Sequence, residues 1–156
     1  MYKTHPVMTG GCQCGAVRYA LFEAPESTIC HCRMCQKAVG GPFAALSKVP
    51  LSRFAWTRGE PASFRSSSAA ERHFCAACGT PLTFRYLDGE AIEVTTGSLD
   101  TPALAPATKV FGAVSRLSWI GLVAPGALPE VPPDTDRDIV SRQHPDHETA
   151  DWVTPA

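Results

Sequence analysis

The sequence predicts a mainly β fold of hairpins and short sheets, with at most short helical turns. Short runs rich in apolar, β-branched and aromatic residues alternate with glycine- and proline-containing turns along most of the chain. Asp88-Gly89 joins two such runs and is the clearest hairpin signal, because both residue types tolerate the positive φ angles of a two-residue turn. The seven cysteines fall in tight groups at the ends of expected strands, so distant turns can be held together through their side chains.

The expected elements follow one another along the chain, each bounded by turn residues. A turn at residues 10–15 carries glycines on both sides of its cysteines, which lets the backbone fold back so that the sulfurs face one point. A Gly-Gly-Pro stop from Gly40 ends one or two helical turns expected over residues 33–39. The expected strands are 16–22, 28–30, 43–49, a strand beginning at Phe54, 62–66, 71–75, 82–87, 91–96 and, more weakly, 110–114 and 118–123.

The chain is expected to divide at residue 123. Residues 1–123 contain all the cysteines and expected strands, and they suffice for a domain with its own core. Residues 124–156 form a proline-rich, polar tail whose apolar residues are too sparse for a core. We expect this tail to wrap on the domain or to be partly disordered.

Composition argues against several classes of partner. The formal net charge is −1, without the basic excess typical of a nucleic-acid-binding protein. No apolar run approaches the roughly 20 residues that span a bilayer. Residues 1–6 lack the apolar region of a secretory signal, so we expect a cytoplasmic protein whose thiols stay reduced or bind metal. Nothing in the sequence indicates the oligomeric state.

Two of the cysteine pairs have the spacing of a closed structural zinc site. Such a site uses four ligands from two short turns, and thiolate suits zinc. Cys12 and Cys14 supply one half-site, and Cys75 and Cys78 supply the other. One ion held by all four would join segments about sixty residues apart, and its binding free energy, on the order of 10 kcal/mol, would stabilise the fold.

The three remaining cysteines, Cys30, Cys32 and Cys35, can hold a second zinc ion from one short turn and leave one coordination position free. A free position is typical of catalytic zinc, so these cysteines are the expected catalytic residues. Two alternatives are open. His31 or His73 could close the site as a fourth ligand, or Cys32 and Cys35 could act as a redox pair.

Cationic side chains accompany the three-cysteine segment. Arg33 and Lys37 follow within the same expected helical turns, where they can keep thiolates ionised and attract an anionic substrate. The alternative is that both are ordinary surface charges. Arg65, Arg72 and Arg85 alternate along the expected hairpins and could line a groove or lie on a solvated face.

Four ordered segments of the sequence resemble the CENP-V/GFA family, named for the glutathione-dependent formaldehyde-activating enzyme. They are Gly-Cys-Gln-Cys-Gly-Ala-Val-Arg-Tyr at 11–19, Cys-His-Cys-Arg-Met-Cys at 30–35, Phe-Cys-Ala-Ala-Cys-Gly-Thr-Pro-Leu at 74–82 and Thr-Gly-Ser-Leu-Asp at 96–100. The resemblance covers about residues 10–123. The sequence departs from it at Lys109-Val110-Phe111, where many members carry a histidine and an aromatic residue.

The resemblance implies a β-rich tent of small sheets around two zinc ions. Cys12, Cys14, Cys75 and Cys78 would hold the structural zinc, while the other three cysteines would hold the catalytic one. The implied reaction joins glutathione to formaldehyde and gives S-hydroxymethylglutathione, the chemistry of a carbon–sulfur lyase. Two other functions stay open: a non-catalytic module that binds zinc, a thiol or a protein, and a thiol redox sensor.

Overall fold

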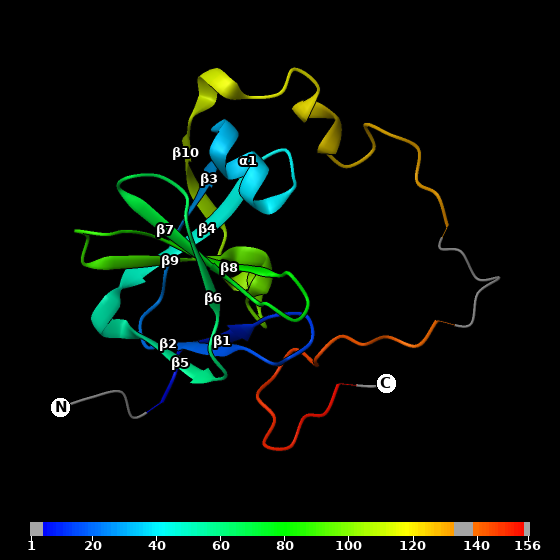
Figure 1. The fold of residues 1–156 in the computed structure, drawn as a ribbon. Helices are drawn as coiled ribbons and strands as arrows, with labels where there is room; N and C mark the ends of the chain where they lie inside the picture. Colours follow the sequence, from blue (N-terminus) through cyan, green and yellow to red (C-terminus); the bar gives the residue numbers. More distant parts are fainter. Residues whose placement is uncertain (1–4, 133–138, 155–156) are drawn as a thin grey trace.

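The computed structural model describes residues 5–132 and 139–154 of the chain. Within these residues the fold is mainly β, as expected, with ten strands in two sheets, one α-helix and short 3-10 turns (Figure 1). The helix α1 (Arg33–Val39) lies at the opposite end of the molecule from the smaller sheet (Figure 1). None of the described helices has the length and apolar character needed to cross a bilayer.

The smaller sheet has three antiparallel strands in the order β1-β2-β5. The larger sheet has seven strands in the order β10-β3-β4-β9-β8-β7-β6, all antiparallel except for the parallel pair β10 and β3. The strands are β1 (Met8–Gly11), β2 (Arg18–Leu21), β3 (Glu26–Cys30), β4 (Ala44–Pro50), β5 (Phe54–Arg58), β6 (Ala62–Arg65), β7 (Ala70–Phe74), β8 (Pro81–Tyr86), β9 (Ala91–Thr95) and β10 (Ala107–Phe111).

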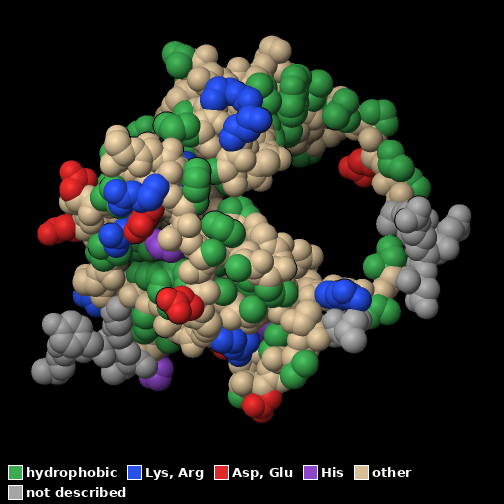
Figure 2. All heavy atoms as spheres, in the orientation of Figure 1, with side chains coloured by type: hydrophobic (Ala, Val, Ile, Leu, Met, Phe, Trp, Pro, Cys, Tyr) green, Lys and Arg blue, Asp and Glu red, His purple; other side chains and the backbone are tan. Residues whose placement is uncertain are grey.

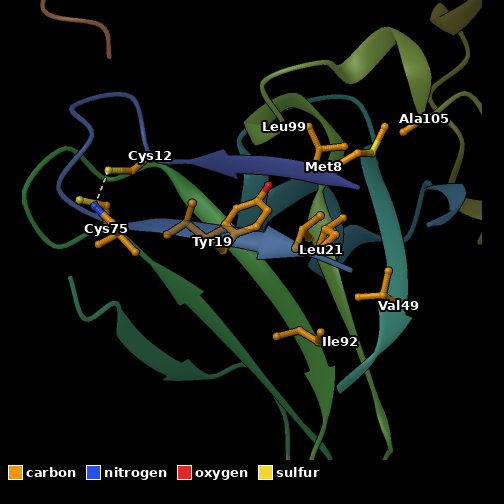
Figure 3. Close-up of a cluster of buried hydrophobic side chains, with 12 residues drawn as sticks. Met8, Cys12, Tyr19, Leu21, Val49, Cys75, Ile92, Leu99 and Ala105 are labelled. Carbon is orange, nitrogen blue, oxygen red and sulfur yellow. Dashed lines mark hydrogen bonds between the residues drawn. The ribbon is translucent and has the colours of Figure 1, made fainter. Parts of the chain in front are cut away.

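The core fills the space between the two sheets (Figure 3). Tyr19 and Leu21 of β2 are fully buried and face side chains of the larger sheet such as Ile92. The Tyr19 hydroxyl shares a 2.7 Å hydrogen bond with Ser98 Oγ, so its polar end is satisfied inside the core. Cys12 belongs to the same buried cluster at one edge, which ties the first cysteine turn to the packing of the whole domain.

A buried arginine lies beside this core. Arg18 is 2% exposed and donates to both carboxylate oxygens of Asp100, at 2.9 and 2.5 Å. Its Nη2 also donates to Glu148 Oε1 at 2.7 Å, so a residue far along the chain completes the ion pair. Burial alone would raise the pKa of Asp100, but hydrogen bonds from Arg18 and Thr9 outweigh it and hold that pKa below its ordinary value.

Part of the C-terminal segment packs against the first cysteine turn. The His144 backbone N–H donates to the Gln13 carbonyl at 2.7 Å, and Trp152 Nε1 donates to the Cys14 carbonyl at 2.7 Å. The His144 and Trp152 rings also meet edge to face, with centroids 5.1 Å apart. The division of the chain at residue 123 stays a prediction.

Three expectations for individual elements were wrong. The strand expected at 110–114 lies at Ala107–Phe111 instead, and residues Ala113–Ser115 form a 3-10 turn. Residues 118–123 do not form a strand: residues Ile120–Val123 make the 3-10 turn η5. Its backbone makes local turn hydrogen bonds, from Leu122 N–H to the Trp119 carbonyl at 2.9 Å for example, and Trp119, Leu122 and Val123 are about half exposed. The turn expected at residues 10–15 begins later, because Gly10 and Gly11 belong to the short strand β1 and pair with Tyr19 and Arg18 of β2.

Replacing Arg18 with glutamine should strongly destabilise the fold, because Asp100 is left charged and 8% exposed without its partner. We expect a loss of about 3–5 kcal/mol in the free energy of unfolding, measured by urea titration. The stabilisation by the Arg18–Asp100 pair is fully present above the pKa of about 4 that Asp100 has in the unfolded chain. It is lost as pH falls through the lower pKa that Asp100 has in the folded protein. The difference between the two proteins should therefore narrow in acid.

Arg53→Gln provides the control, because Arg53 makes an exposed pair with Glu23 at 3.7 Å. That change should lower the free energy of unfolding by less than about 1 kcal/mol. Equal effects of the two substitutions would contradict the role assigned to the buried pair.

Candidate functional site

The first cysteine group lies where two turns meet beside the core. Cys12 and Cys14 follow β1, and Cys75 and Cys78 follow β7. Their four sulfurs all lie within 4.8 Å of one another, so the structure brings together the two half-sites expected from the sequence. Each turn ends in a glycine with φ of 77°, a conformation that other residues rarely adopt.

The spacing of these sulfurs fits a tetrahedral zinc ion. Four sulfurs at about 2.3 Å from a common centre are separated by about 3.8 Å. The Cys12 and Cys14 sulfurs are 3.6 Å apart, and those of Cys14 and Cys75 are 3.8 Å apart. Burial raises the pKa of the Cys12 thiol, so a cation is needed to keep this buried group ionised.

Backbone and hydroxyl donors support the same group. The Val17 N–H donates to Cys12 Sγ at 3.2 Å, and the Thr80 hydroxyl lies 3.2 Å from Cys78 Sγ. Burial would raise the pKa of Cys78, yet the hydrogen bonds from Thr80 and neighbouring backbone groups lower it to about 6. Thiolates held in this way are suited to a closed structural metal site.

The second cysteine group lies at the start of α1. Cys30 is the last residue of β3, Cys32 is the N-cap of α1, and Cys35 is in its first turn. The three sulfurs lie within 4.8 Å of one another. The Cys35 N–H donates to Cys32 Sγ at 3.4 Å, so the helix end itself fixes the second ligand of the group.

Among the described residues, no histidine or carboxylate joins this second group as a fourth ligand. The His31 ring is buried against Phe43, with centroids 5.7 Å apart. The His73 ring is partly buried, shares a 2.7 Å hydrogen bond with Thr83 Oγ1 and meets the Trp56 ring edge to face. A tetrahedral ion held by the three cysteines would therefore have one position for an external ligand.

A cavity of about 450 Å³ opens beside the three cysteines, and we call it the cysteine cavity. Arg72 Nη2 donates to Cys35 Sγ at 3.2 Å, while its guanidinium carbon lies 4.8 Å from the centre of the Phe84 ring. Phe84 thereby holds the arginine against the thiol. The other charged residues that line the cavity are Lys48, Arg85 and Glu93.

Glu93 brings an acidic group into this cavity that sequence reasoning missed. It pairs across the sheet with Lys48 on one side and Phe84 on the other. Partial burial raises its pKa, against the opposing charges of Lys48 and Arg72. The alternation Ile92-Glu93-Val94 could have indicated this position, because two buried apolar neighbours send the carboxylate to the opposite face of the sheet.

The structure separates the cations that the sequence placed near the three cysteines. Arg33 and Lys37 lie on the exposed side of α1 and line a second cavity rather than the cysteine cavity. Arg33 Nη1 donates to Gln36 Oε1 at 2.5 Å. Arg72 is the arginine that contacts a sulfur, while Arg85 pairs with Glu71 at 2.8 Å and Arg65 is exposed.

Comparisons with known proteins agree with this site. A family model described as glutathione-dependent formaldehyde-activating enzyme matches residues 7–113, which include all seven cysteines. A Schizosaccharomyces pombe protein named as an uncharacterized lyase is 36% identical over 86 residues, or 54% of this chain and 62% of that protein. The match therefore spans less than two thirds of that relative.

A solved structure has a similar fold. A crystal structure of a Rhodobacter sphaeroides protein matches with a TM-score of 0.54 and 23% identity. The match covers 66% of this chain and 99% of the Rhodobacter chain. At this identity the similarity concerns the fold alone.

The two cysteine groups should respond differently to substitution. We expect Cys78→Ser to lower the zinc content by one ion per chain and to shift the unfolding transition by several kcal/mol, because that ion would join the two sheets. Cys35→Ser should remove a different zinc ion and leave the far-UV circular dichroism unchanged. Elemental analysis and urea unfolding check both expectations, and identical losses of stability would contradict them.

Proposed function

Because the chain belongs to the family of glutathione-dependent formaldehyde-activating enzymes, we propose that it joins the thiol of glutathione to formaldehyde and gives S-hydroxymethylglutathione. This is lyase-type carbon–sulfur chemistry, and the lyase name of the Schizosaccharomyces pombe relative supports it. The observation that carries the proposal is the three-cysteine group in the wall of a charged cavity of about 450 Å³. Cys30, Cys32 and Cys35 are the proposed catalytic residues.

The proposed cofactor is zinc in both cysteine groups. Cys12, Cys14, Cys75 and Cys78 would hold a structural ion, and the other three cysteines would hold a second ion with a position for an external ligand. The second ion, when bound, would lower the pKa of a thiol that enters the cavity. Arg72 donates to Cys35 Sγ and so favours the anionic form of that ligand.

The charges of the cysteine cavity are complementary to those of glutathione. Glutathione carries two carboxylates and one ammonium group around its thiol. Lys48 and Arg85, which also pair with Glu26 and Glu71, offer cations for the carboxylates. Glu93 offers an anion for the ammonium or for a proton. Arg33 and Lys37, outside this cavity, stay proposed as cations that attract an anionic substrate.

The proposed role of Glu93 is proton transfer. A carboxylate oxygen of Glu93 would take the proton from the thiol, and the sulfur would form a bond to the carbonyl carbon of formaldehyde. The carbonyl oxygen, which gains the electron pair of the C=O π bond, would then receive the proton back and become the hydroxyl group. The raised pKa of Glu93 suits both directions of this transfer at moderate pH.

Formation of S-hydroxymethylglutathione should be faster with the zinc-loaded protein than in buffer, measured by exchange NMR with the spontaneous rate subtracted. Cys35→Ser should reduce the enzymatic rate to background. Arg72→Gln should reduce it about tenfold or more, because the thiolate loses a charge-assisted hydrogen bond. Saturable glutathione binding without any acceleration would instead favour a thiol-binding module, and a reversible Cys32–Cys35 disulfide with zinc release would favour a redox sensor.

The pH dependence of the rate tests Glu93. The carboxylate acts as a base only when deprotonated, so the rate should fall as pH drops through the pKa of Glu93, which lies above that of an ordinary glutamate. Glu93→Gln should lower the rate and remove this acid limb. Glu90→Gln, at an exposed position between β8 and β9, is the matched control and should keep the acid limb of the pH profile. An unchanged acid limb in the Glu93 variant would exclude the role.

A further inference from the structure

A second and larger cavity, of about 580 Å³, lies next to the cysteine cavity, between α1 and the strands β6, β7 and β8. We call it the helix cavity. Met34 and Arg72 line both cavities, so these two side chains form the wall between them. We propose that the helix cavity binds the body of a larger carbonyl substrate, an aldehyde that carries an aromatic or branched apolar group and a carboxylate. This inference rests on the proposed function, because it names the aldehyde class of the same reaction.

The size of the cavity argues for a substrate larger than formaldehyde. Sites for small organic molecules measure roughly 300–1,000 Å³, and the helix cavity lies within this range. Formaldehyde has one carbon and one oxygen, and the cysteine cavity beside the thiolates already has room for it together with a thiol. Formaldehyde alone would not fill the helix cavity, so this space can hold the remainder of a larger aldehyde.

The walls of the helix cavity are largely apolar. Phe64 is 62% exposed and Met34 is 59% exposed, although both are large hydrophobic side chains on regular elements. Phe74, Val39 and Pro81 extend the same surface. A bound aromatic or branched group would cover these side chains, and the flexible methionine can adapt to its shape.

The charge of the cavity selects an anionic ligand. Arg33, Lys37 and Arg72 line it, and no aspartate or glutamate is found among its described lining residues. Within residues 5–132 and 139–154, no ion pair joins any of these three cations to a carboxylate. Figure 2 shows basic side chains gathered over the region of α1. Arg72 already contacts the Cys35 sulfur, so a carboxylate on the ligand would meet the positive charges of Arg33 and Lys37, which no carboxylate pairs with in the described residues.

The arrangement of these groups also sets the direction of the ligand. Arg33 and Lys37 belong to α1, whereas Arg72, a residue of the shared wall, belongs to β7. With its carboxylate at the helix and its apolar body against Phe64, the ligand would direct its carbonyl group past Met34 toward the cysteine cavity. There the thiol sulfur would form a bond to the carbonyl carbon, and the thiol proton would move to the carbonyl oxygen, which becomes a hydroxyl group.

Direct binding tests this site without catalysis. We would titrate 4-carboxybenzyl alcohol, an unreactive analogue of 4-carboxybenzaldehyde, into the zinc-loaded full chain without thiol and measure the heat. We expect saturable binding that Lys37→Gln and Phe64→Ala each weaken about tenfold, through loss of a charge contact and of apolar contact. Both positions are exposed, so these variants should keep the zinc content and far-UV circular dichroism of the parent. Arg53→Gln, which removes an exposed cation outside the cavity, is the control and should bind normally.

Kinetics then tests the substrate class. The ratio of kcat/KM for 4-carboxybenzaldehyde to that for benzaldehyde should exceed about ten and should fall toward one in Lys37→Gln. Absence of saturable binding, or competition by glutathione for the same site, would overturn the inference. Binding as expected but no thiol-dependent turnover of any aldehyde, formaldehyde included, would overturn the proposed function and with it the assignment of the ligand as a substrate.

Discussion

The rest of the structure depends on the meeting of four sulfurs between two turns far apart in sequence. Cys12 and Cys75 are both buried in the main hydrophobic cluster, so the sulfur group is part of the core and not an attachment to its surface. The first turn leads into β2 of the small sheet, and the second joins β7 to β8 of the large one. An ion shared by these turns would hold the sheets face to face, which a small core alone does weakly.

The two cysteine groups consist of the same residue type but have different surroundings. The four-cysteine group is enclosed by the core, by backbone donors and by the segment that contains His144 and Trp152. The three-cysteine group lies on the opposite side of the large sheet, in the wall of a cavity with charges of both signs. The fold thus encloses one cysteine group beside the core and leaves the other in the wall of a cavity.

Features that depend on residues close together in the sequence could be predicted from the sequence alone. The cysteine groups follow from their spacing, and the extent of α1 follows from the Gly-Gly-Pro stop, because both depend on neighbours in sequence. The contact of Arg72 with Cys35 could not be predicted in this way, because it requires β7 to lie beside α1 after the strands have paired. Likewise, the position of Glu93 in the cavity depends on the register of β9 with β4 and β8. Residues 118–123 have strand-like composition, yet Ile120–Val123 form a 3-10 turn, an outcome that composition alone does not predict.

The contact between Trp152 and the Cys14 carbonyl joins residues 138 positions apart, and it has a consequence for biosynthesis. A ribosome delivers the chain from its N-terminus, so the turn with Cys12 and Cys14 emerges long before the tryptophan that covers it. Both half-sites of the four-cysteine group are already outside when residue 78 has emerged and the linker to the covering segment is still being made. The four cysteines are thus available to a metal ion before the segment with His144 and Trp152 exists, and the contacts of that segment with the first turn can form only later. The order of the sequence therefore places the four cysteines before the segment that covers their first turn.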